Sequence, residues 1–182
     1  PKRPFVAIMG GSKVKDKIAL IDNLLPKVDR LLIGGGMAFT FLKAQGYEIG
    51  KSLLDESNLE YAKKLVETSG DKLVLPTDVV CAAELSPTAT TSTCSVTAIP
   101  AGEIGADIGP ETQATFAKIV MEAGTALWNG PMGVFEMTPF EAGTKTVAEA
   151  LAAGNALSIV GGGDSAAAMD KFGLADKVTH VS

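Results

Sequence analysis

The sequence predicts an α/β domain in three layers, with helices on both faces of a mostly parallel sheet of about six strands. Short apolar runs alternate with longer amphipathic segments along the whole chain, which is typical of this architecture. A glycine or glycine cluster follows four of the apolar runs, at residues 10–11, 34–36, 130 and 161–163. The length of 182 residues and the apolar share of 46% are sufficient for one domain with its own core.

Each expected strand is a short apolar run between glycine, proline or polar residues. We expect strands at residues 5–9, 31–33, 73–75, 126–128, 157–160 and 177–181. Residues 79–82 either extend the third of these strands past Pro76 or follow it as a separate strand. The segment 86–97 is rich in Ser and Thr, which predicts a surface excursion, with an edge strand near Val96 as the alternative.

The expected helices repeat apolar residues at intervals of three and four. They span residues 14–25, 37–44, 59–68, 110–122, 139–153 and 165–171. Pro26 ends the first helix, and Pro110 suits the first turn of the fourth. Thr138 and Glu141 have the spacing of a capping box, with proline at the first helical position between them.

Composition argues against several classes of protein. The net charge of −5 and the sequence pI near 4.9 disfavour nucleic acid as a partner. No apolar run approaches the roughly 20 residues that a membrane span needs. A zinc site lacks ligands because His180 is the only histidine, and Cys81 and Cys94 are expected to be free thiols in a reducing compartment. The first residues resemble neither a signal nor a transit peptide, and predict the middle of a longer chain.

The turn after the first expected strand carries Lys13 and Lys17, which one helix would place on the same face. Two like charges at this spacing repel by about 0.2–0.5 kcal/mol, and an anion bound between them would reverse that effect. A solvated helix start with scattered lysines explains the pattern equally well. The turn is neither a Walker loop nor a Gly-x-Gly-x-x-Gly dinucleotide turn.

Two later turns carry carboxylates. Residues 128–136 combine glycines, a proline and large apolar side chains, which predicts the wall of a pocket. Glu136 there either binds sugar hydroxyls or is an ordinary surface carboxylate. Asp164 follows the glycines 161–163 and either caps the next helix or faces a magnesium ion on a nucleotide.

Four motifs in this order are similar to those of the C-terminal domain of phosphoglycerate kinases. They are Gly-Gly-Ser-Lys-Val-Lys-Asp-Lys-Ile (10–18), Gly-Gly-Gly-Met-Ala-Phe-Thr-Phe-Leu (34–42), Trp-Asn-Gly-Pro-Met-Gly-Val-Phe-Glu (128–136) and Gly-Gly-Gly-Asp-Ser (161–165). The resemblance implies a Rossmann-like fold and a site for ADP or ATP with Mg²⁺. It also implies reversible phosphoryl transfer from 1,3-bisphosphoglycerate to ADP, with phosphoglycerate bound by an N-terminal domain. Residues 85–97 depart most from the family pattern.

The resemblance also implies roles for individual residues. Catalytic roles fall to Lys13, Gly162 and Gly163, and the metal contact falls to Asp164. Nucleotide contacts fall to Gly11, Lys13, Lys17, Gly34, Gly35, Gly105, Asn129, Glu136, Gly162, Gly163, Asp164 and Ser165. Lys13 would be nearest the transferred group, Glu136 would approach the ribose, and Gly105 would line the adenine end.

The resemblance predicts that residues 1–182 form a single nucleotide-binding domain. We expect the chain to be the C-terminal half of a two-domain kinase, without the substrate domain and without a final glycine-rich turn and helix. It should then be inactive alone, monomeric and cytoplasmic, with a plastid as the alternative location. Two other functions compete with this interpretation: an NAD-binding oxidoreductase domain and a non-catalytic nucleotide-binding module.

Overall fold

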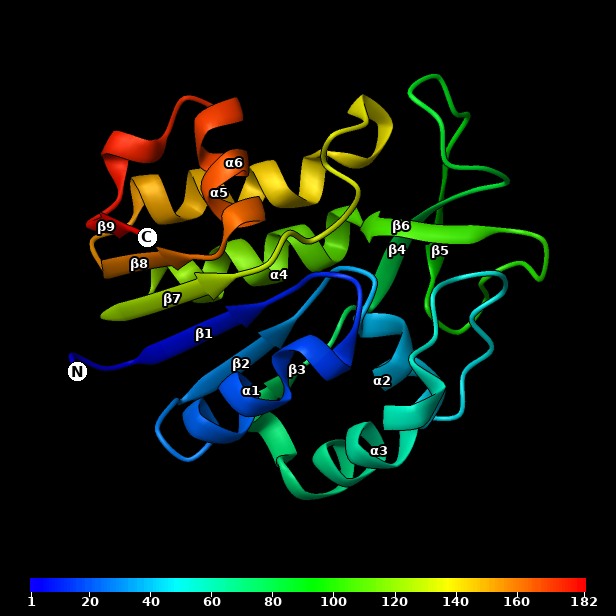
Figure 1. Cartoon of the computed structure of the whole chain (residues 1–182), viewed down its shortest axis with the longest axis horizontal. Helices are drawn as coiled ribbons and strands as arrows, with labels where there is room; N and C mark the ends of the chain where they lie inside the picture. Colours follow the sequence, from blue (N-terminus) through cyan, green and yellow to red (C-terminus); the bar gives the residue numbers. More distant parts are fainter.

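A computed structural model describes residues 1–182 and contains a six-stranded, wholly parallel sheet (Figure 1). The strand order is β3-β2-β1-β7-β8-β9. The bounds are β1 (Phe5–Met9), β2 (Arg30–Ile33), β3 (Leu73–Val74), β7 (Thr125–Asn129), β8 (Leu157–Gly161) and β9 (His180–Val181). The expected α/β fold with about six mostly parallel strands is therefore confirmed.

Helices cover both faces of this sheet (Figure 1). One face packs against α1 (Ile18–Leu24), α2 (Ala38–Ala44) and α3 (Leu59–Thr68). The other packs against α4 (Pro110–Met121), α5 (Ala142–Ala153) and α6 (Gly163–Lys171). Short 3₁₀ turns are η1 (Val14–Lys17), η2 (Glu56–Asn58), η3 (Gly70–Lys72), η4 (Thr138–Phe140) and η5 (Ala175–Lys177). None of the helices combines the length and the hydrophobicity that crossing a bilayer requires.

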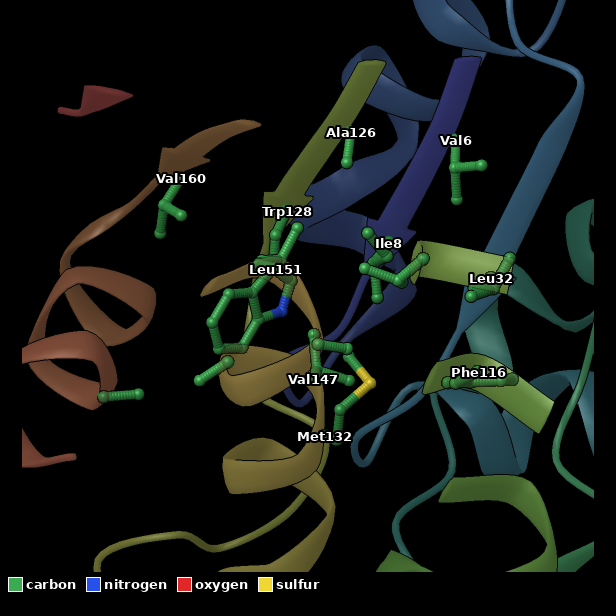
Figure 2. Close-up of a cluster of buried hydrophobic side chains, with 14 of the residues drawn as sticks. Val6, Ile8, Leu32, Phe116, Ala126, Trp128, Met132, Val147, Leu151 and Val160 are labelled. Carbon is green, nitrogen blue, oxygen red and sulfur yellow. The ribbon is translucent and has the colours of Figure 1, made fainter. Parts of the chain in front are cut away.

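Strand β1 shows how the sequence divides its side chains between the two layers of core. All five of its residues are buried, as expected for a central parallel strand. Val6 and Ile8 join the cluster on the α4–α6 side, and Ala7 and Met9 join the cluster under α1–α3. Figure 2 shows the first cluster, in which the fully buried Trp128 is surrounded by apolar side chains.

The structure also contains a second, antiparallel sheet that the sequence analysis missed. Its order is β5-β4-β6, with β4 (Asp78–Ala82), β5 (Ser92–Ser95) and β6 (Ile104–Ile108). Residues 79–82 therefore do not extend the third strand of the main sheet. The edge strand anticipated near Val96 exists as β5, so the segment 86–97 is more than a surface loop.

Two buried aspartates attach this second sheet to the helices of the main one. Asp78 accepts hydrogen bonds from the backbone N–H groups of Glu111 and Thr112 at the start of α4, both at 2.9 Å. Asp107 accepts from the N–H of Gly143 at the start of α5, at 2.8 Å. Each carboxylate thus caps a helix that has no capping side chain at its own N-cap residue. Burial raises the pKa of Asp107 well above its ordinary value, although two backbone N–H donors oppose the shift.

Three local expectations were wrong. The capping box does not form, because residues 138–140 make a 3₁₀ turn and α5 begins only at Ala142, where Asp107 supplies the cap. The last strand covers only His180–Val181, because Lys177 belongs to the turn η5 and residues 178–179 form a bend. Asp164 does not cap α6, because the N-cap position is taken by Gly162, with a φ of 92°.

The expected helix from residue 14 also differs in its first turn. Lys13 is extended, with φ −131° and ψ 136°, and the 3₁₀ turn η1 precedes α1. The two lysines therefore do not face one another across a turn of α-helix, and the repulsion expected for like charges at α-helical spacing does not apply to this turn.

Candidate functional site

All four glycine turns lie at the carboxyl ends of neighbouring strands, in the order β2, β1, β7 and β8. Three of them are joined by backbone hydrogen bonds. The N–H of Gly10 donates to Asn129 O at 2.9 Å, and that of Gly11 donates to Pro131 O at 3.0 Å. The N–H of Gly35 donates to Met132 O at 3.1 Å. The turns after β1, β2 and β7 thus form one interlocked unit, which we call the interlocked turns (residues 10–11, 34–36 and 130–132).

The interlocked turns require glycine because other backbone fills the space of a side chain. Gly130 has a φ of +103°, and a Cβ on it would overlap the carbonyl of Gly10. Gly35 has a φ of +71°, and its Cβ would lie 2.6 Å from Pro131 O. These glycines serve the packing of the turns on one another.

The turn after β8, which we call the open turn (residues 161–163), is different. A Cβ on Gly163 would meet no heavy atom within 4 Å, and Gly162 and Gly163 are both exposed. The N–H of Ala166 is the first to bond back, to Gly162 O, so the amide groups of residues 163–165 lie outside the helical ladder of α6. The open turn therefore presents backbone and the positive end of a helix of nine residues to solvent.

Lys17 reaches the space beside the open turn. Its ammonium donates a hydrogen bond to Asn129 Oδ1, and this amide oxygen lies within 3.2 Å of the place a Cβ on Gly162 would take. Partial burial lowers the pKa of Lys17, while the negative charges of Asp16 and Asp164 act in the opposite direction. The structure thus brings together Lys17, Asn129, Gly162 and Asp164, and leaves Lys13 exposed to solvent.

A cleft of about 180 Å³ adjoins the turns. It is lined by Gly11, Ser12, Gly35, Gly36, Leu53, Leu85, Ile104, Gly105, Ala106, Pro131, Gly133, Val134, Glu136 and Asp164. Five residues predicted from the sequence are among them: Gly11, Gly35, Gly105, Glu136 and Asp164. The cleft joins a polar end at Asp164 to an apolar wall.

Most of the apolar wall was not predicted from the sequence. Leu53 and Leu85 are large apolar side chains that remain 53% and 40% exposed, and Ile104 and Val134 lie beside them. They come from separate segments of the chain, so no local motif contains them. The only sequence feature that could have indicated Leu53 and Leu85 is the presence of leucine in segments expected to be loops. Leu85 also lies in the segment that departs from the family pattern.

Two predicted site residues lie behind the cleft. Gly34 is buried, and a Cβ there would collide with the side chain of Met132. Ser165 is fully buried, and its Oγ accepts a hydrogen bond from the N–H of Gly130 at 2.7 Å. This bond ties the open turn to the interlocked turns.

A larger hollow of about 660 Å³ lies away from the glycine turns, near the start of β1. Its charged residues include Arg3, Asp29, Arg30, Lys118 and Glu122. Arg3 is already paired with Asp29 at 2.9 Å. Because none of the glycine turns lines this hollow, we place the candidate site at the smaller cleft, where exposed helix N–H groups and a lysine converge.

The protein residues alone do not form a closed metal site, since no cluster of three or more potential ligands is present. Asp164 is one exposed carboxylate in the first turn of α6. A single carboxylate suits Mg²⁺, which in phosphate sites completes its coordination with water and with oxygens of the bound ligand.

The fold is that of an open, doubly wound α/β domain, and the candidate cleft lies at the carboxyl ends of its parallel strands, where domains of this class bind ligands. The family model described as phosphoglycerate kinase matches residues 1–182. The chain therefore belongs to the phosphoglycerate kinase family, as the resemblance of its motifs predicted.

Relatives and solved structures agree with this assignment. The chain is 56% identical to a phosphoglycerate kinase of Clostridium novyi (strain NT), with 100% of this chain and 46% of that protein covered. It is 56% identical to one of Chlorobium chlorochromatii (strain CaD3), again over the whole chain and 47% of the relative. The structure of phosphoglycerate kinase from Coxiella burnetii matches with a TM-score of 0.97 at 50% identity, covering 100% of this chain and 48% of that one. The chain thus spans about half the length of the relatives it matches.

Proposed function

We propose that this chain is the nucleotide-binding half of a phosphoglycerate kinase. Together with a substrate-binding half, it would transfer a phosphoryl group reversibly between 1,3-bisphosphoglycerate and ADP in glycolysis. The observation that carries the proposal is the open turn at the N-terminus of α6, with Lys17 beside it and the apolar cleft adjoining. A nucleotide needs these three features in a row: N–H groups and positive charge for its phosphates, and an apolar wall for its base.

The phosphate end of the nucleotide is proposed to lie at the open turn. The phosphates would lie against Gly162 and Gly163, with Lys17 and Asn129 alongside and Lys13 near the transferred group. The main-chain N–H of the exposed Asp164 would add a donor, whereas the buried Ser165 would support the turn through the hydrogen bond that its Oγ accepts from Gly130.

The other end of the nucleotide would occupy the cleft. The ribose would approach Glu136, and the base would enter between the glycines at positions 11, 35 and 105. Gly34 would support this wall from behind rather than contact the ligand.

Asp164 would hold Mg²⁺ together with phosphate oxygens of the nucleotide, and the ion would neutralise phosphate charge. The same carboxylate lies close enough to Lys17 to act on its pKa. The residues therefore fit the ion without a dedicated protein cage.

The reaction suits a site without a general base. In the ATP-consuming direction the nucleophile is a carboxylate with a pKa of roughly 4, so it is ionised at neutral pH. Catalysis then depends on positioning and on positive charge around the moving phosphoryl group. Lysines and helix N–H groups supply the positive charge and position the phosphates, and no Ser-His-Asp arrangement is required.

Monomeric state and cytoplasmic location are part of the same proposal. Both cysteines are free thiols, which supports a reducing compartment. The acidic net charge of −5 supports neither nucleic acid nor an anionic membrane surface as a partner.

Titration calorimetry of the chain with MgADP tests the proposal. We expect binding, and a loss of roughly tenfold or more in affinity when Lys13 and Lys17 are both replaced by Ala, since charged hydrogen bonds are each worth about 1.5–3 kcal/mol. Lys63→Ala, an exposed lysine on α3, is the matched control and should bind as the wild type does.

Three outcomes would contradict the proposal. Absence of MgADP binding up to millimolar concentration would exclude the nucleotide site. Preferential binding of NAD would favour the oxidoreductase alternative, and unchanged affinity in the double variant would remove the lysines from the site. The chain alone should also show no turnover of 1,3-bisphosphoglycerate, because the substrate-binding half is supplied by another part of the enzyme.

A further inference from the structure

Lys171 lies at the end of α6 opposite to the open turn. Its ammonium donates a hydrogen bond to the backbone oxygen of Phe135 at 2.5 Å. It lies 5.9 Å from the ring centre of Phe135 and 5.6 Å from that of Phe172, which are cation–π distances. Its side chain is 35% exposed, and Glu141 is 3.8 Å away.

The acceptor of this bond is the carbonyl directly before Glu136. The neighbouring N–H groups of the loop are held elsewhere: that of Val134 donates to Ala106 O at 2.9 Å, and that of Met137 donates to Val134 O at 3.0 Å. The peptide group between Phe135 and Glu136 therefore receives its side-chain support from Lys171. This peptide group leads directly into Glu136, which lines the cleft.

Helix α6 thus has a contact with the site at each end. Its first residues form the open turn, and its last residue fixes the peptide before Glu136. A helix of nine residues is short and stiff, so the distance between these two ends is set by its length.

We propose that Lys171 is a positioning residue that holds Glu136 for the ribose hydroxyls and couples that end of the cleft to the phosphate end through α6. The inference rests on the proposed function, because it assumes that a nucleotide lies along the cleft. Lys171 itself does not touch the nucleotide.

The test compares MgADP with its 2′,3′-dideoxy analogue, which lacks the hydroxyls that Glu136 would bind. By titration calorimetry, Lys171→Met should lose about tenfold in affinity for ADP and less than about twofold for the dideoxy analogue. Lys171→Arg keeps a cationic donor over the two rings and should retain most of the ADP affinity. Lys145→Met, an exposed lysine on α5, is the matched control.

A double-mutant cycle separates positioning from general damage to the fold. Glu136→Gln should also remove the preference for ADP over its dideoxy analogue. Adding Lys171→Met to this variant should lower the affinity for ADP little further. Lys171→Gln serves as a second variant should the Met variant fail to fold, with the same expectation.

Equal losses for both ligands in the Lys171 variants would overturn the inference, because they would indicate a structural role only. Unchanged ADP affinity in these variants would overturn it as well, and so would a wild-type chain that binds both ligands equally. These outcomes differ from failure of the proposed function, in which the wild-type chain binds neither ligand.

Discussion

The interlocked turns and the open turn look alike in sequence and differ in what their glycines accommodate. At Gly10, Gly35 and Gly130, in the turns after β1, β2 and β7, the space left by the missing side chain is filled by neighbouring backbone. In the turn after β8, the space beside Gly163 is left to solvent. The glycines at positions 10, 35 and 130 therefore hold the frame of the site, whereas Gly163 leaves its backbone open to a ligand.

The largest expected effect comes from a substitution that disrupts the interlocked turns. Gly130→Ala should lower the free energy of unfolding by more than about 3 kcal/mol, since it adds the strain of a positive φ to overlap with the backbone of Gly10. Urea denaturation measures this change. Gly46→Ala is the matched control, with a φ of +98° and nothing within 4 Å of its Cβ. It should lose only about 1–2 kcal/mol, and equal losses at the two positions would contradict the distinction.

The second prediction addresses the open turn. Gly163→Ala should leave the free energy of unfolding within about 0.5 kcal/mol of the wild type, because the Cβ meets nothing and the φ is not positive. The affinity for MgADP should nevertheless fall by about tenfold, since the methyl group would occupy the approach of a phosphate. Urea denaturation and calorimetry on the same sample give both numbers. A variant that loses stability and affinity together would show that this glycine also serves the fold.

The smallest effect concerns Lys17, which lies between the two regions. Its pKa is lowered in the folded state, so the folded chain binds this proton less tightly than the unfolded chain. The contribution of Lys17 to the free energy of unfolding should therefore rise with pH between that lowered pKa and the ordinary value of 10.5. Lys17→Met should lack this rise and should gain less than about 1 kcal/mol at pH 7.

Urea denaturation across this pH range measures the difference. Lys63→Met should keep the slope of the wild type. If the free energy of unfolding of Lys17→Met rises with pH as it does in the wild type, the rise belongs to another group. Burial of Lys17 would then not destabilise the folded chain.

Much of the main sheet could be predicted because parallel strands buried on both faces are continuous apolar runs that glycines terminate. The second sheet as a whole could not, because β5 and β6 break that pattern, although residues 79–82 of β4 are expected as a strand. Gly105 interrupts β6, where a Cβ would strike the ring of Phe39, and Asp107 is buried there to cap a helix far along the chain. Strand β5 is Ser-Thr-Cys-Ser and shows no apolar alternation.

The candidate site divides in the same way. Its glycines, lysines and carboxylates lie within motifs, so their order along the chain indicates them. The apolar wall could not be predicted from any motif, because Leu53 and Leu85 come to line the same cleft only once the chain is folded. The role of Lys171 depends likewise on a contact between residues 36 positions apart.

The pairing of β1 with β7 has a consequence for synthesis of the protein. The backbone oxygen of Lys2 accepts a hydrogen bond from Thr125, 123 positions along the chain. At about 5–20 residues per second, a ribosome needs roughly 6–24 s to supply the partner strand. During that time the edge of β1 that will face β7 is open on the nascent chain, with five apolar residues in a row. An apolar edge at the centre of the finished sheet is therefore open to aggregation until translation reaches β7.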